Sequence, residues 1–167
     1  MELIKYNGDA FDDLIKNIDS PFEMMVWAGP KYKYPLTLDQ LQERMNQTSN
    51  GKIKNHLFNL FDDAIKKIIG YIEIEILDEK TKKGSIQSVL IYKDYRGKKY
   101  SEQLLDLIIS YSVHKLNLQT LELKVFSFNK AAISCYQKVG FVEDEILDHI
   151  NPETGKAFQI IVMKRQK

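Results

Sequence analysis

The amino-acid sequence predicts an α+β (mixed α/β) fold, and three observations carry this prediction. Between residues 66 and 77, isoleucines alternate with polar or aromatic residues, which is typical of a half-buried strand. Residues 102–116 carry apolar side chains at helical spacing over one broad face, which indicates a helix lying on a sheet. The expected elements follow in the order β, two helices, three strands, α, β, α, β, β, and one sheet with helices on its faces accommodates that order.

The first half of the chain alternates short strands and helices. We expect a strand over 2–6, a helix over 10–18 ended by Ser20 and Pro21, an irregular aromatic segment over 24–35, a helix over 38–45 with Thr37 as its N-cap, and a strand over 56–62. Asn50 and Gly51 mark the turn before that last strand.

The second half begins with an antiparallel hairpin. Its expected elements are strands over 66–77 and 85–92, a helix over 102–116, a strand over 120–127, a helix over 130–139 capped by Asn129 and stopped by Gly140, and strands over 141–147 and 158–164 around the turn residues Asn151, Pro152 and Gly155.

The length and the net charge limit the kinds of protein that this chain can be. A chain of 167 residues is long enough for one domain, residues 1–167, with its own core. Lys and Arg number 24 and Asp and Glu 23, so the formal net charge is +1. This balance argues against a nucleic acid or an anionic membrane as the main partner. Aliphatic runs fall far short of the roughly 20 residues that a membrane span needs.

The cysteine and histidines indicate neither a disulfide nor a metal. Cys135 is the only cysteine, so we expect a cytoplasmic protein, and the first residues lack the pattern of a secretory signal. His56, His114 and His149 lie far apart without ligand spacing, and Cys135 has no evident histidine base. We therefore expect no metal and no thiol catalyst.

A basic turn precedes the longest expected helix. The strand over 85–92 continues through the sequence Tyr95-Arg96-Gly97-Lys98-Lys99-Tyr100-Ser101 into that helix. Free amides and the dipole at a helix N-terminus favour an anion, and Gly97 allows the backbone to approach it closely. This feature alone is equally compatible with a solvated basic turn.

Residues 88–101 and 129–141 together resemble the GNAT superfamily of N-acetyltransferases. Residues 88–101, with Val89-Leu90-Ile91 and then Tyr95-Arg96-Gly97-Lys98, are similar to the family's acetyl-coenzyme A motif. Residues 129–141 are similar to its other motif through Asn129, Ala132, Tyr136, Lys138, Gly140 and Phe141. The resemblance covers most of the chain and is strongest over 69–142. It implies a GNAT-like, mostly antiparallel, twisted and splayed sheet of six or seven strands, flanked by about four helices.

The family's phosphate loop has small residues where this chain has Lys99 and Ser101. If the turn demands a positive φ, a lysine there costs about 1 kcal/mol or more. Lys99 is therefore expected either in an ordinary helical conformation or under strain, and Ser101 is small enough to help as a cap.

The resemblance also implies a coenzyme site. Its expected residues are Val89, Leu90, Ile91, Arg96, Gly97, Lys98, Lys99, Tyr100, Ser101, Asn129 and Tyr136. The backbone of Leu90 and Ile91 would bind the pantetheine arm like an added strand. An N–H near these residues would then face the thioester carbonyl and stabilise charge developing on its oxygen.

Tyr136 is the residue that the resemblance matches to the proton donor for the departing thiolate. A phenol of pKa near 10 gives its proton to a thiol of pKa near 8.5 at a cost of roughly 2 kcal/mol. By spacing, Tyr136 and Phe141 also occupy the hydrophobic pair of a Schellman cap around Gly140. The two roles are compatible.

The base is expected from the strand over 66–77. Glu73 and Glu75 share one face there, and some family members use a carboxylate on that strand, although such alternation also marks a merely half-exposed strand. A base acting through water is the other possibility. Some members carry a glutamate at the position of Lys124, so that subset's base is missing here.

The aromatic segment over 24–35 lies where the family builds its acceptor-binding wall. Trp27, Tyr32 and Tyr34 are the candidates to surround an amine, to which aromatic rings are suited. The alternative is a loop that closes the core, more so for Trp27 than for the tyrosines.

Together these features predict direct acetyl transfer from acetyl-CoA, as cosubstrate, to the primary amine of a small molecule or a protein, with a homodimer as one possible assembly. The alternative is a non-catalytic sensor or scaffold that binds acyl-CoA. A nucleic-acid module built on residues 96–99 lacks a wider basic surface.

Overall fold

A single seven-stranded sheet organises the computed structural model, which describes residues 1–151 and 154–167. Its strands are β1 (Glu2–Lys5), β2 (Asn55–Asp62), β3 (Lys67–Asp78), β4 (Lys83–Ile91), β5 (Thr120–Phe126), β6 (Val142–Ile150) and β7 (Ala157–Gln166). Within the described ranges the order is β1-β2-β3-β4-β5-β7-β6, and all neighbours are antiparallel except β4 and β5. The mostly antiparallel α+β sheet expected from the sequence is confirmed. The expected turn residue Pro152 lies outside the described residues.

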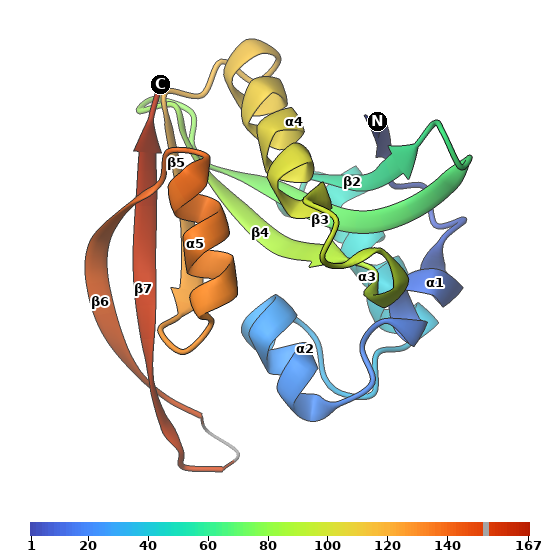
Figure 1. Ribbon diagram of the computed structural model, residues 1–167, viewed down its shortest axis with the longest axis horizontal. Coiled ribbons are helices and arrows are strands. Elements are labelled where there is room, and N and C mark those ends of the chain that lie inside the picture. Colours follow the sequence, from blue (N-terminus) through green and yellow to red (C-terminus); the bar gives the residue numbers. More distant parts are fainter. Residues whose placement is uncertain (152–153) are drawn as a thin grey trace.

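The sheet splays between its two parallel strands. β4 and β5 pair only where Lys83–Ser85 lie opposite Thr120–Glu122, and beyond that point the strands separate. Figure 1 shows β5, β7 and β6 as an arm that diverges from β4. The diverging ends leave one edge of β4 without a neighbouring strand, as the resemblance implied.

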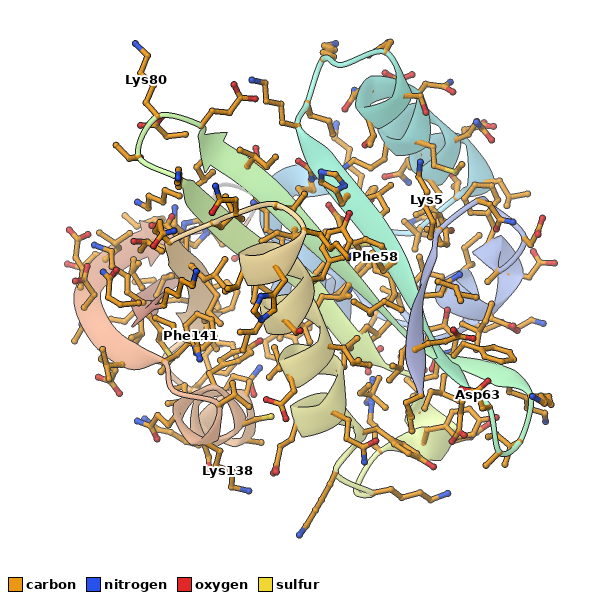
Figure 2. The ribbon with its side chains drawn as sticks, turned by 90° about the horizontal axis from the view of Figure 1, so that it is seen from above. Lys5, Phe58, Asp63, Lys80, Lys138 and Phe141 are labelled. Atoms are coloured by element: carbon orange, nitrogen blue, oxygen red, sulfur yellow. The ribbon has the colours of Figure 1, made fainter. Side chains whose placement is uncertain are left out.

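Helices cover both faces of the sheet (Figure 1). One face of the sheet is covered by α4 (Tyr100–His114) and α5 (Lys130–Lys138). The other face is covered by α1 (Phe11–Lys16), α2 (Pro21–Ala28) and α3 (Leu38–Ser49). The chain also forms two short 3-10 helices, η1 (Gly29–Lys31) and η2 (Lys93–Tyr95). Phe58 of β2 lies beside α4 (Figure 2), where its ring meets that of Tyr111 edge-on at 4.8 Å. None of the described helices is both long and apolar enough to cross a membrane.

The expected irregular segment over 24–35 is wrong, because α2 occupies its first part. Ser20 and Pro21, interpreted as a helix end, begin a helix instead: the Ser20 hydroxyl accepts a hydrogen bond from the Glu23 N–H at 3.1 Å, and Pro21 is the first helical residue. Proline suits that position since its missing N–H would have no partner there. In the described part of the chain, three α-helices rather than two therefore separate β1 from β2.

Candidate active site

The basic turn before α4 is open to a ligand. Gly97 has a φ of 78°, and a Cβ built on it meets nothing within 4 Å. Arg96 donates from Nε to the Ile91 carbonyl at 3.0 Å, and the Lys98 ammonium lies 5.8 Å from the centre of the Tyr95 ring. Among the described residues, no side chain caps the α4 N-terminus. Its free amides and the surrounding cations therefore fit a diphosphate.

Lys99 is the N-cap of α4 and adopts the left-handed conformation, with φ 61° and ψ 12°. Of the two expectations for this residue, the strained one is correct. The turn requires the geometry that glycine adopts freely, and its lysine side chain is exposed rather than folded into the turn. Ser101 lies half-buried in the first turn of α4, and the Tyr100 hydroxyl ties that turn to β2 by donating to Asp62 at 3.1 Å.

The free edge of β4 lies between this turn and the splay. The Tyr92 N–H donates to the Ile69 carbonyl across the β3 ladder at 2.9 Å. Because N–H directions alternate along a strand, the Ile91 N–H faces away from β3, and that of Leu90 faces β3. Of the two residues expected to bind the pantetheine arm, Ile91 has the outward amide.

A β-bulge interrupts β4 at Ser88. Tyr71 pairs with Leu90 and Glu73 with Gln87, so that Ser88 and Val89 together lie opposite one residue of β3. Ser88 has a φ of 51° and is only 5% exposed. Its carbonyl accepts a hydrogen bond from Trp27 Nε1 at 2.9 Å. The Lys31 ammonium donates to the Ser88 hydroxyl and to Gln87 Oε1, both at 2.7 Å.

Glu73 is fully buried within a polar cluster. Its carboxylate accepts from Arg44 Nη2 at 2.7 Å, Asn55 Nδ2 at 3.0 Å and the Tyr71 hydroxyl at 3.2 Å, and it lies 3.7 Å from Lys31 Nζ. Burial alone would raise the pKa of the Glu73 carboxyl, but Lys31 and Arg44 outweigh it and hold that pKa below its ordinary value. Burial lowers the pKa of the Lys31 ammonium, against the opposing pull of Glu73.

Glu75, two residues further along β3, is half-buried and accepts a short hydrogen bond from the Gln87 amide. Within the described residues it forms no salt bridge. The two glutamates therefore share a face but not an environment, since Glu73 is paired with cations and Glu75 has a neutral donor.

Tyr136 takes part in the cap at the end of α5. The Phe141 N–H donates to the Tyr136 carbonyl and the Gly140 N–H to the Gln137 carbonyl, each at 3.0 Å, while the Tyr136 and Phe141 rings meet edge-on at 6.3 Å. Gly140 has a φ of 91°. This is the Schellman motif that the spacing predicts. Figure 2 shows Phe141 within the molecule and Lys138 projecting from its edge.

The rest of α5 matches the sequence pattern. Asn129 caps the helix, accepting from the Ala132 N–H at 3.3 Å. Burial, and secondarily Cys135, raises the pKa of the Tyr136 hydroxyl. The contacts of the cap come from the Tyr136 ring and backbone, so the capping role does not depend on the hydroxyl. Cys135 is half-buried, and burial raises the pKa of its thiol.

The three aromatic candidates do not form one wall. Trp27 and Tyr32 are buried, 8% and 6% exposed, and stack on each other with ring centres 5.4 Å apart. Tyr34 is 42% exposed, and its hydroxyl donates to the Asp19 carbonyl at 2.9 Å. Trp27 reaches the β4 bulge, whereas Tyr34 makes no described contact with it.

Sequence reasoning missed Lys31, Arg44 and Ser88. Arg44 lies three residues after the buried Leu41, and that helical spacing would have turned it toward the sheet. Ser88 stands at the start of the 88–101 motif, but its positive φ was not predicted, because non-glycine residues seldom adopt that conformation. Lys31 follows Gly29-Pro30 in the segment expected to be irregular.

A cavity of about 370 Å³ opens beside this cluster, between η1 and α3. Its lining comprises Lys31, Tyr32, Asp39, Gln40, Glu43, Arg44 and Gln47. Two carboxylates and two cations therefore line a space of the size that small molecules occupy. The described residues hold no group of three or more His, Cys, Asp or Glu suited to a metal ion.

A known protein family and several individual proteins are similar to this chain. A model of the acetyltransferase (GNAT) family matches residues 16–141. Spermidine N(1)-acetyltransferase from Vibrio cholerae serotype O1 is 26% identical over 121 residues, covering 72% of this chain and 66% of that protein. The uncharacterized N-acetyltransferase YycN from Bacillus subtilis is 29% identical over 94 residues, covering 56% and 59%. The chain thus spans somewhat under two thirds of the length of these relatives.

Solved structures give the same fold. The crystal structure of spermidine N-acetyltransferase from Vibrio cholerae in complex with CoA and spermine has a TM-score of 0.83 and 22% identity, covering 98% of this chain and 94% of that one. A dodecameric structure of spermidine N-acetyltransferase from the same organism has a TM-score of 0.75, also at 22% identity, covering 98% and 92%. The GNAT-like architecture expected from the sequence is confirmed, and the chain belongs to the acetyltransferase (GNAT) family.

Proposed function

We propose that the protein transfers the acetyl group of acetyl-CoA directly to the primary amine of a small molecule. The main support for this proposal is the order of three features along β4: a bulge held by side-chain hydrogen bonds, an outward amide at Ile91, and an open basic turn that leads into α4. This order matches the thioester, pantetheine arm and diphosphate of one extended cosubstrate. Acetyl-CoA, the family's cosubstrate, supplies the activated acetyl group.

The coenzyme is held, in this proposal, mainly by backbone. The α4 amides and the side chains of Arg96, Lys98 and Lys99 bind the diphosphate. The Ile91 amide binds the pantetheine arm, and the Val89 amide, which lies in the bulge two residues before Ile91, faces the thioester carbonyl. An N–H already aimed at that oxygen stabilises the negative charge that develops on it.

Two side chains take part in proton transfer in this proposal. The Tyr136 hydroxyl donates to the departing thiolate, and the raised pKa of this hydroxyl makes the transfer costlier than for a free phenol unless the bound coenzyme changes its surroundings. We assign the base to Glu75, acting through water, because its carboxylate is half-buried and forms no salt bridge among the described residues, in contrast to Glu73. Glu73, held by Lys31 and Arg44, organises the floor of the site instead.

The acceptor, in this proposal, enters through the cavity between η1 and α3. Asp39 and Glu43 on its wall suit an ammonium group, and its volume of about 370 Å³ favours a small molecule over a protein surface. Spermidine, which three of the four compared sequences and structures carry in their names, is the first acceptor to test.

The test is release of coenzyme thiol from acetyl-CoA with a panel of amines: spermidine, spermine, a monoamine and a lysine-containing peptide. We expect sustained turnover with a small amine. Binding of acetyl-CoA without turnover on any amine would favour the sensor or scaffold alternative. Lack of acetyl-CoA binding would refute the proposed site itself.

We also propose that the protein forms a homodimer. Edge strand β6 exposes Val142, Ile146 and Ile150, each more than half accessible, and such residues favour an apolar contact between chains. Analytical ultracentrifugation would decide it, and a monomer at high concentration would contradict it.

A further inference from the structure

The β4 bulge has a strained backbone at a buried position. Ser88 holds a φ of 51° although it is not glycine, and it is 5% exposed. Such a conformation costs free energy and persists only where its surroundings enforce it. The surroundings that do so here come from another part of the chain.

Trp27 and Lys31 enforce the bulge from α2 and η1. Trp27 donates from its indole Nε1 to the Ser88 carbonyl at 2.9 Å, and Lys31 donates to the Ser88 hydroxyl at 2.7 Å. Trp27 is itself fixed, because it stacks on Tyr32 at 5.4 Å with planes 7° apart and meets the Tyr71 ring edge-on at 5.9 Å. The indole N–H therefore has one direction available.

The Ser88 carbonyl and the Val89 N–H belong to the same peptide group. That group is planar and trans, so its C=O and N–H point in opposite directions, and fixing one fixes the other. A hydrogen bond to the carbonyl also polarises the group and makes its N–H a stronger donor. Neither Ser88 nor Val89 has a pairing partner on β3, so the ladder does not fix this amide.

We propose that Trp27 is a positioning residue: its indole N–H aims and polarises the Val89 N–H that faces the thioester carbonyl. This inference rests on the proposed function and deepens it. Trp27 then acts on acetyl transfer from behind β4, through one peptide group, rather than by contact with the acceptor. A merely structural Trp27 would fill the core equally well without its N–H.

Trp27 is the only tryptophan in the chain, so one atom can be changed. Growth on β-(3-benzothienyl)alanine replaces the indole N–H by sulfur and leaves the bicyclic shape. We expect kcat to fall about tenfold, less than the 10²–10³ that loss of a whole oxyanion donor costs, with the KM for acetyl-CoA within twofold. The infrared carbonyl stretch of bound ¹³C-acetyl-CoA should move toward its value in water.

Tyr6→Phe is the matched control. It removes a hydroxyl in the same aromatic cluster that has no partner among the described residues, and it should alter neither the carbonyl stretch nor kcat. An unchanged stretch and kcat in the substituted protein, with acetyl-CoA still bound, would overturn the inference alone. Failure of the unaltered protein to bind acetyl-CoA would overturn the proposed function and the inference together.

If the substituted chain fails to fold, NMR spectroscopy of the native protein tests the inference instead. Its one indole N–H resonance should shift when acetyl-CoA binds and stay in place with free coenzyme A, which lacks the carbonyl. Equal shifts with the two ligands, or none, would overturn the inference.

Discussion

At the scale of the residue, Lys99 combines a cationic side chain with a backbone conformation that lysine disfavours. Its φ of 61° falls in the left-handed region, which costs non-glycine residues roughly 1–2 kcal/mol. The neighbouring Lys98 is not among the positive-φ residues. Two adjacent lysines of the same turn therefore differ in backbone strain, and this makes a direct comparison possible.

Replacing Lys99 with glycine should raise the free energy of unfolding, by up to about 1 kcal/mol once the greater freedom of the unfolded glycine is subtracted. Lys98→Gly relieves no strain and should lower that free energy. Urea denaturation of the two variants and the parent measures both effects. A Lys99→Gly variant less stable than Lys98→Gly would contradict the assignment of strain to Lys99.

Tyr136 serves a cap through its ring and backbone, and this separates its structural role from its hydroxyl. Tyr136→Phe should therefore leave the melting temperature and the acetyl-CoA affinity unchanged, while turnover falls on the order of a hundredfold for want of the proton donor. Calorimetry and thiol release give the two readouts. Full turnover in the phenylalanine variant would remove Tyr136 from the proton-transfer step.

At the scale of the element, the sequence was most informative where hydrophobic period and capping residues agree. The strand around Ile72 and Ile74, the α3 cap at Thr37 and the α5 cap at Asn129 all follow from local chemistry, and all are present. The splay of β4 from β5 came only from family resemblance, because strand pairing is not a local property.

α2 shows why local sequence patterns can mislead. The residues of α2 are almost uniformly apolar, so no stripe distinguishes its buried face, and Ser20-Pro21 signals either the end of one helix or the start of the next. The candidate site, too, could be predicted only where a local motif marks it. The basic turn could be predicted from its motif, whereas the cluster of Lys31, Arg44 and Glu73 joins elements distant in sequence and marked by no spacing.

At the scale of the whole molecule, the Glu73 cluster joins η1, α3 and β2 to the centre of the sheet. The pKa of the Glu73 carboxyl is lower in the folded chain than the ordinary 4.5. Its contribution to stability is therefore fully present above about pH 4.5 and is lost as pH falls through the folded-state pKa. Acid should unfold the protein by protonating this carboxylate.

Glu73→Gln should lower the free energy of unfolding by about 3 kcal/mol at neutral pH, because the half-buried Arg44 and Lys31 then lose the carboxylate that pairs with them, and its stability should vary less below about pH 4.5. Glu75→Gln, on the same face of β3 but in no described salt bridge, should keep parental stability and lose about a hundredfold in turnover. Denaturation across that pH range and thiol-release rates test the pair. Equal stabilities of all three proteins would refute the cluster's role, and full turnover of Glu75→Gln would refute the base.

The half-buried thiol beside Tyr136 has a practical bearing on these measurements. Burial raises the pKa of Cys135, so at neutral pH little of it exists as the thiolate that attacks electrophiles. Chromogenic disulfide reagents will then register liberated coenzyme with little background from the polypeptide, and mild alkylation will leave α5 unmodified while scavenging contaminating thiols.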